Sequence, residues 1–305
     1  MNLDRFAVLP QFLLPKQLLT TWMGRLSARE RGALTAWMIR TFIRRYGVDM
    51  AEAAEPDPTA YPTFNAFFTR PLRAGVRPIA SSAWVSPVDG TVSQLGPITD
   101  GRLIQAKGHT FSLNQLLGGD RPLAETLHDG SFATLYLAPR DYHRIHMPRA
   151  GALVSMRYVP GALFSVNPRT ARGVPGLFAR NERVICRFAD LNGRQGDFVM
   201  VLVGATIVGS IETTWHGVVT PPRSDTVRTW IYPIEGSLPS NRSSATPGSA
   251  LPVRLDRGEE MGRFALGSTV IVLMPPDADA AFLARWQPGA SIQVGEAMAG
   301  RLRQA

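Results

Sequence analysis

The N-terminal part of the chain carries apolar residues at the spacing of amphipathic helices. A first helix is expected over 16–26. The capping-box pattern Ser27-Ala28-Arg29-Glu30 predicts that a second helix begins there, and Gly47 is the expected end of that helix. Thr63 is expected to cap a third, short helix whose phenylalanines form its apolar side. The sequence therefore opens with helices that each have one apolar face.

From about residue 84 the pattern changes to short β-type runs separated by Gly, Pro and Asn, which is typical of strands joined by turns. The runs are Ser131 to Leu137, Ala152 to Val159, Arg183 to Phe188, Phe198 to Val203, Ala205 to Ile211 and Thr269 to Met274. Asn192-Gly193 is a hairpin signal between two of them, and one further helix is expected over 279–285. The fold class predicted is α+β and mostly β, with N-terminal amphipathic helices followed by a predominantly antiparallel β domain.

Two segments have no clear period. Residues 49–61 are rich in Ala and Pro and are expected to be a linker, and residues 237–252 are polar, turn-rich and expected to form an exposed loop. The most apolar run, 198–211, is interrupted by Gly, Thr and Ser and is shorter than the roughly 20 residues of a spanning helix. We also expect no secretory signal, because no basic segment precedes a long apolar stretch near the N-terminus.

The charge of the chain indicates which class of partner it could bind. The 305-residue chain has a formal net charge of +9, and all but Lys16 and Lys107 of its 33 basic residues are arginines. Arginine pairs with phosphate and carboxylate, which favours an acidic partner, although a GC-rich coding sequence alone could produce the same composition. Arg and aromatic residues on amphipathic helices suit a membrane interface, and packing on the β domain or a second subunit is the alternative. The single cysteine, Cys186, excludes an internal disulfide.

Three short stretches hold the candidate chemistry. His143 and His146 lie between prolines. Two histidines three residues apart could bind zinc, but the sequence offers no evident third ligand. Asp89 lies in an Asp-Gly turn signal, and Ser268 follows Gly267 just before an apolar run. The order Asp, His, Ser also suits a serine hydrolase, but a Gly-x-Ser-x-Gly elbow is missing at Ser268.

Several stretches together resemble the phosphatidylserine decarboxylases. They cover roughly 60–275 and include Val85 to Val92, Leu137 to Pro148, Phe178 to Arg183, Val203 to Ile211 and Leu266-Gly267-Ser268-Thr269 with its flanks. The resemblance implies a region 1–65 that is helical and associates with membrane, and a β-rich catalytic domain 66–305. It also implies self-cleavage between Gly267 and Ser268 into chains 1–267 and 268–305.

In that family the serine becomes a pyruvoyl group, which forms a Schiff base with the substrate amine; neither pyridoxal phosphate nor a metal is then needed. The resemblance assigns Asp89, His146 and Ser268 to the self-cleavage triad and His143 to decarboxylation and protonation. His109, in a stretch similar to the family, and Phe164, in an apolar stretch that could line a lipid site, are candidate substrate-binding residues, with packing in the core as the alternative for each.

The activity implied is conversion of phosphatidylserine to phosphatidylethanolamine, peripherally on the cytoplasmic face of the cell membrane. The expected partners are an anionic phospholipid surface and a second copy of the αβ unit, with no nucleic acid. Three alternatives remain: a pyruvoyl decarboxylase of a soluble amino acid, a Ser-His-Asp hydrolase, and a non-enzymatic binder of anionic lipid or nucleic acid.

Overall fold

The structure is a computed structural model, and it describes residues 20, 24–106, 108–191, 196–206, 210–234, 246–247, 251–265, 268–278 and 280–301. The helices are α4 (Ala33–Tyr46), α5 (Phe64–Phe68), α6 (Leu113–Leu116), α7 (Arg121–Thr126), α8 (Pro168–Gly173), α9 (Leu177–Arg180) and the 3-10 helix η1 (Pro276–Ala278). Antiparallel sheets dominate, with helices α4 and α5 near the N-terminus, so the predicted fold class is confirmed.

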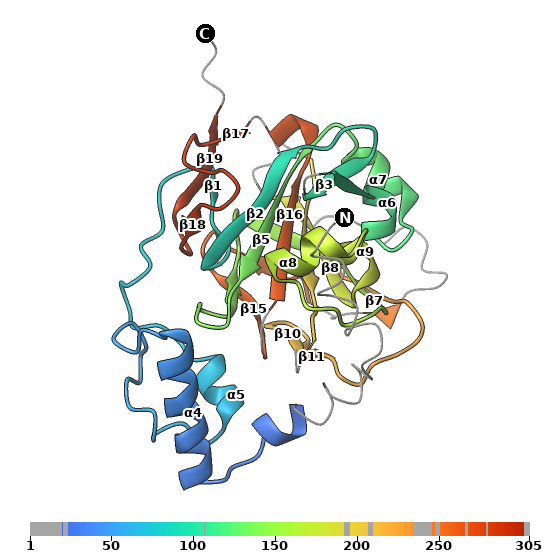
Figure 1. Ribbon diagram of the computed structural model, residues 1–305. Helices are drawn as coiled ribbons and strands as arrows, with labels where there is room; N and C mark the ends of the chain where they lie inside the picture. The colour runs from blue at the N-terminus through green and yellow to red at the C-terminus, as the bar shows by residue number, and fades with distance from the viewer. Residues whose placement is uncertain are drawn as a thin grey trace.

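The main sheet runs in the order β13-β12-β7-β8-β9-β16-β5-β2-β18, with β14 paired to β7. Its strands are β2 (Gly90–Pro97), β5 (Ser131–Leu137), β7 (Gly151–Val159), β8 (Arg183–Asp190), β9 (Phe198–Val203), β12 (Arg228–Ile231), β13 (Thr246–Pro247), β14 (Arg254–Leu255), β16 (Ser268–Met274) and β18 (Ser291–Ile292). Every pairing in it is antiparallel except that of β12 with β13. Figure 1 shows β16 standing in the middle of this sheet.

Three smaller sheets surround the main one. They are β11-β10-β15-β6, β1-β19-β17 and β3-β4. Their strands are β1 (Trp84–Val85), β3 (Arg102–Ala106), β4 (His109–Ser112), β6 (Arg144–His146), β10 (Ile211–Thr213), β11 (Gly217–Thr220), β15 (Glu260–Phe264), β17 (Ala280–Phe282) and β19 (Ala297–Arg301).

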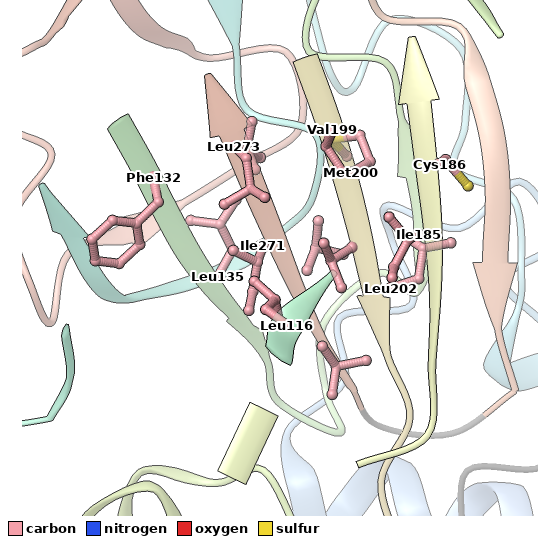
Figure 2. Close-up of a cluster of buried hydrophobic side chains, with 14 of the residues drawn as sticks. Leu116, Phe132, Leu135, Ile185, Cys186, Val199, Met200, Leu202, Ile271 and Leu273 are labelled. Carbon is pink, nitrogen blue, oxygen red and sulfur yellow. The ribbon is translucent and has the colours of Figure 1, made fainter. Parts of the chain in front are cut away.

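The hydrophobic core lies on the central strands of the main sheet. All residues of β9 and β16 are buried, which is why these two runs are almost continuously apolar rather than alternating. Figure 2 shows Ile271 and Leu273 of β16 with Val199 and Met200 of β9 in a buried cluster that also contains Cys186. The core therefore fixes β16, and with it the position of Ser268.

Local signals placed several elements correctly. Thr63 caps α5 by accepting a hydrogen bond from the Ala66 N–H at 3.0 Å. Gly47 ends α4 in the left-handed conformation, with φ 68°. The predicted hairpin is present as the antiparallel pair β8–β9, although Asn192-Gly193 itself lies outside the described residues. Of the helix expected over 16–26, the structure describes only residue 20 and residues from 24 onward, and 24–27 are helical. Most of the loop expected over 237–252 lies outside the described residues.

Three predicted elements are wrong. The capping box does not open α4: the Ser27 hydroxyl donates back to the Gly24 carbonyl at 3.2 Å, closing the preceding turn, and α4 begins after Gly32. The strand expected over 205–211 is interrupted, because pairing with β8 stops after Gly204: the Gly204 carbonyl accepts from the Asn181 side chain, and the Glu182 N–H bonds the Ala162 carbonyl instead. β10 consequently begins only at Ile211.

The helix expected over 279–285 is also wrong, because residues 280–282 are strand β17, paired with β19. Alanine-rich sequence favours helix, but pairing with a strand formed by the chain's last described residues overrides that preference. Four short helices in the β domain were not expected: α6, α7, α8 and α9. Each has six residues or fewer, so none leaves a clear helical period in the sequence.

Candidate active site

One end of the main sheet brings the candidate residues toward each other. Ser268, the first residue of β16, lies opposite Leu137, the last residue of β5. One step along the strands, Thr269 lies opposite Tyr136, which in turn lies opposite Thr91 of β2. Asp89 immediately precedes β2, so Ser268 and Asp89 lie at the same end of three neighbouring strands.

Ser268 is fully buried, with 0% of its surface exposed. Its hydroxyl has no hydrogen-bond partner among the described residues. Two other buried hydroxyls in the same sheet also lack a partner among the described residues, those of Thr134 and Thr269. It is therefore the position of Ser268 beside Asp89, together with its free hydroxyl, that makes it a candidate. Leu266 and Gly267 lie outside the described residues, and the structure therefore says nothing of the Gly267 carbonyl.

His146 ends β6 and has a partner on each side of its ring. Nδ1 lies 2.8 Å from the Gly258 carbonyl oxygen, and Nε2 lies 3.2 Å from the Tyr142 hydroxyl. A carbonyl can only accept, so Nδ1 carries the proton and Nε2 presents a lone pair. Burial lowers the pKa of His146, against smaller opposing effects of the Gly258 hydrogen bond and nearby carboxylates. His146 is thus held as a neutral base.

Asp89 is a buried carboxylate with two firm partners. Arg77 donates to it from Nη2 at 2.6 Å, and the Val294 N–H donates at 2.8 Å. Arg77 also binds Glu52 at 2.6 Å, which ties the segment after α4 to this carboxylate. The resemblance assigns to Asp89 the orientation of His146. In this structure the hydrogen bond that orients the ring comes from Gly258, while the Asp89 charge raises the pKa of His146 from a distance.

His143 has a different environment. It is completely buried, and its ring lies 4.1 Å from that of Phe68 on α5. Its Nδ1 donates to the Asp141 carbonyl at 2.8 Å, and its Nε2 has no partner within the described part of the chain. Burial, together with the nearby Arg70 charge, lowers the pKa of His143 to about 3. His143 is therefore a neutral imidazole whose Nε2 can only accept a proton.

A polar cavity of about 160 Å³ adjoins Asp89 and is also lined by Arg70, Arg77, Asp141 and Tyr142. Burial raises the pKa of Asp141, whose carboxylate accepts from the Ala138 N–H at 2.7 Å. The space is large enough for several ordered waters at roughly 30 Å³ each. Water can therefore be held next to the candidate carboxylate.

The two residues suggested for substrate binding lie elsewhere in the fold. His109 begins β4 on the β3–β4 hairpin and is partly exposed. Phe164 is 3% exposed, belongs to the main hydrophobic core and lies under the Arg180 guanidinium at 5.4 Å. The geometry does not assign a ligand to either side chain.

Sequence reasoning did not single out Tyr142, Gly258 or Arg77 as partners of the candidate residues. Gly258 offers a signal, because φ 83° there favours glycine and turns the chain so that its carbonyl meets His146. Tyr142 and Arg77 lie within or beside the quoted motifs, but their contacts become visible only in the folded chain. No group of three or more His, Cys, Asp or Glu residues arranged to hold a metal ion occurs among the residues described.

Comparison with known proteins identifies the family. A family model described as phosphatidylserine decarboxylase matches residues 64–300, and another described as PSD matches residues 6–47. The phosphatidylserine decarboxylase proenzyme of Azoarcus sp. (strain BH72) is 59% identical over 295 residues, which cover 97% of this chain and 96% of that protein. The protein of the same name from Delftia acidovorans (strain DSM 14801 / SPH-1) is 55% identical over 298 residues, or 98% of each chain. The chain therefore belongs to the phosphatidylserine decarboxylase family, and the resemblance seen in its motifs is confirmed.

Proposed function

We propose that this chain converts phosphatidylserine to phosphatidylethanolamine with a pyruvoyl group that it makes from Ser268 by cutting itself after Gly267. Membership of the family supports the decarboxylation. The observation that carries the rest is the buried Ser268 hydroxyl, without a partner among the described residues, at the sheet end where Asp89 also lies.

In the proposed self-cleavage, His146 Nε2 takes the proton of the Ser268 hydroxyl while the oxygen attacks the Gly267 carbonyl. The amide becomes an ester, and the nitrogen that leaves Gly267 takes up a proton. A base, for which His146 is again the candidate, then removes the Cα proton of residue 268, and the ester bond to the serine side chain breaks, leaving Gly267 as a carboxylate and residue 268 as a dehydroalanine. Its imine tautomer reacts with water to give pyruvoyl and ammonia. The polar cavity beside Asp89 is a source for that water.

The residues present fit such a group. Residue 268 opens a fully buried strand, so a group formed there would be held in a fixed position away from bulk water. A pyruvoyl carbonyl supplies the electron sink that decarboxylation of an α-amino acid requires. No lysine is needed for this chemistry, which suits a chain whose two lysines lie at 16 and 107.

We propose that His143 moves protons for the substrate. Its Nε2 lacks a hydrogen-bond partner among the described residues, so it can bond the substrate amine. Because burial lowers the pKa of His143, its imidazolium is a strong acid, and a proton passed to Nε2 as the substrate ammonium reacts is readily given to the carbon from which carbon dioxide has left. The Phe68 ring lies against the His143 ring and forms one wall of this pocket.

The decisive experiment is intact mass of the purified protein with its Ser268→Ala variant. We expect the wild type to split between Gly267 and Ser268, and the variant to stay whole and release no carbon dioxide from phosphatidylserine. Thr269→Val is the matched control, because Thr269 is equally buried and its hydroxyl also lacks a partner among the described residues. It should still cut at the same bond. A whole, active wild-type chain would refute the proposal.

We further propose peripheral attachment to an anionic phospholipid surface through the N-terminal helices. Trp37 and Leu34 of α4 are 59% and 44% exposed, while Phe42 on the same helix packs against α5. Arg44 and Arg45 lie in the last turn of α4, where they can meet lipid phosphate. No helix in the described ranges is long and apolar enough to cross a bilayer. A homodimer and the cytoplasmic face of the membrane remain predictions.

Flotation with anionic vesicles tests the attachment. The double variant Leu34→Gln, Trp37→Ser should lose vesicle binding severalfold, because two interfacial apolar side chains are removed. Leu251→Gln is the matched control, since Leu251 is 73% exposed outside these helices. Equal binding by all three proteins would show that α4 is a packing element only.

A further inference from the structure

A second cavity, of about 380 Å³, lies between the segment 24–28, helix α5 and the β10–β11 hairpin. Its lining includes Arg25, Ala28, Asn65, Ser210, Val218 and Arg223. We propose that it binds the phosphodiester and glycerol part of a glycerophospholipid, with the two arginines as the anion-binding side chains. This inference rests on the function proposed above and gives its substrate a place outside the reacting centre.

The charge of the lining suits a phosphodiester. Among the described residues that line it are two arginines and no carboxylate. Glu182, which is 2% exposed, lies behind Arg223 with its Oε2 3.1 Å from Arg223 Nε, and it accepts a hydrogen bond from the Tyr158 hydroxyl at 3.0 Å. That contact anchors the Arg223 side chain, so ligand binding costs less conformational entropy. It also offsets part of the Arg223 charge, which leaves Arg25 as the cation that gives the cavity its excess positive charge.

The polar inventory of the lining agrees with such a ligand. The Asn65 side-chain oxygen is buried without a hydrogen-bond partner among the described residues. That oxygen needs a donor, which in this ligand only the serine ammonium supplies, while the Asn65 amide NH₂ can donate to a phosphate oxygen. Apolar walls from Ala28 and Val218 suit the ester end of the acyl chains, and Val218 is 49% exposed although it is a large apolar residue. A free phosphate ion would make no use of these walls.

The cavity adjoins the candidate active site through two of its walls. The Ser210 carbonyl accepts a hydrogen bond from the Ala265 N–H at 3.0 Å, close before Ser268 in the chain. Asn65 is on α5, one helical turn from Phe68, which contacts the His143 ring. The serine amine of the substrate is only a few bonds from the phosphorus. A phosphate in this cavity therefore places the amine near His143 and residue 268.

The position within the molecule suits a ligand that comes from a membrane. Figure 1 shows α4, α5 and the β10–β11 hairpin at the same end of the protein. This end carries the exposed Trp37 and Leu34 of α4. A phospholipid could thus reach the cavity from the surface to which the helices attach, without passing through bulk water.

Two lining variants test the assignment, and both change exposed positions so that folding is preserved. Arg25→Glu removes the cation and Val218→Asp places a carboxylate against the phosphate. Both should cut themselves completely, since self-cleavage needs no lipid. Their KM for phosphatidylserine in vesicles should rise about tenfold or more with a smaller change in kcat, as expected when a charge-assisted contact made equally in ground and transition states is lost. Arg29→Glu, an exposed arginine of the neighbouring segment, is the matched charge control and should stay within about twofold.

Each failure has its own meaning. A wild type that releases no carbon dioxide from phosphatidylserine refutes the proposed function. A wild type that is active, with both lining variants matching it in KM, overturns the cavity assignment alone. Inorganic phosphate separates the ligand sources: we expect vesicles of phosphatidylglycerol to compete with substrate where phosphate at equal concentration does not. Equal competition by phosphate would overturn the assignment to a lipid.

Discussion

The pockets of His143 and His146 differ sharply, although the two residues belong to one short segment. At His146 both ring nitrogens have partners, the Gly258 carbonyl and the Tyr142 hydroxyl. At His143 only Nδ1 has one within the described part of the chain, and the Phe68 ring lies against the imidazole. Both imidazoles are neutral because burial lowers their pKa. The difference therefore lies in access to Nε2 and not in charge.

This difference suggests how one segment can serve two reactions in sequence. His146 ends β6 of the smaller β11-β10-β15-β6 sheet, and its backbone N–H donates to the Pro87 carbonyl at 2.8 Å, which places it beside the loop that carries Asp89. The pocket of His143 is completed by α5, from the N-terminal helical part of the chain. A base for cutting the backbone can thus be supplied by the β domain alone, while the proton carrier for a lipid substrate needs the helices as well.

The largest expected effect separates the two histidines with matched asparagine variants. Asparagine keeps a donor near the position of Nδ1 and removes Nε2. His146→Asn should slow self-cleavage at least about a hundredfold, because the general base is lost. His143→Asn should cut normally but release carbon dioxide about a hundredfold more slowly.

Intact mass measures the cutting and trapped carbon dioxide the decarboxylation. If His143→Asn also failed to cut, the two pockets would not be functionally separate. If His146→Asn cut at the wild-type rate, another group would be the base.

A medium effect concerns acid stability. The pKa of His143 is about 3 in the folded protein and near 6.5 in an unfolded chain. Between these two pH values the imidazole is neutral in the folded protein and protonated in the unfolded chain. Stability is therefore full above about pH 6.5 and falls as the pH drops toward 3. At pH 5 the loss from this group alone is about 2 kcal/mol.

In the uncut Ser268→Ala background, His143→Asn should thus show a smaller fall in Tm between pH 7 and pH 5. His128→Asn, at a side chain that is 50% exposed, is the control and should fall as far as the parent. An unchanged pH dependence in His143→Asn would mean that His143 is not held neutral by burial.

The smallest expected effect comes from a substitution that removes the partner of His146 Nε2, so that this nitrogen becomes unpartnered among the described residues, like Nε2 of His143. The Tyr142 hydroxyl donates to the lone pair that must receive the Ser268 proton, so the two compete. Tyr142→Phe should free Nε2 and speed self-cleavage by about threefold to tenfold, the value of one neutral hydrogen bond. Time courses of cleavage after rapid refolding would measure this. Slower cleavage would show that the hydroxyl passes the proton on instead of blocking it.

Sequence reasoning succeeded where a short segment decides its own structure. Thr63 caps α5, Gly47 ends α4, and the strand expected over 269–274 is present as β16. It failed where a distant segment decides. Residues 280–282 are a strand because β19 pairs with them, and pairing with β8 stops after Gly204 because the Asn181 side chain takes the Gly204 carbonyl.

The same distinction applies to the candidate site. The identities of Asp89, His143, His146 and Ser268 came from motifs, and their roles remain predictions. Their partners come from segments remote in the chain, such as Gly258 for His146 and Val294 for Asp89. No local pattern in the sequence could have predicted these contacts, because each depends on how the sheets assemble.

The central position of β16 has a consequence for the lifetime of the protein. β16 lies between β5 and β9, and the same C-terminal part supplies β18 to β2 and β19 to β1. The precursor folds as one chain, in a first-order process independent of concentration. After a cut at 267, refolding would require two chains to meet, the smaller of which lacks the partners of its most apolar strand. A cut molecule that unfolds would therefore aggregate more readily than it recovers, so its durability depends on the rate of unfolding and not on an equilibrium.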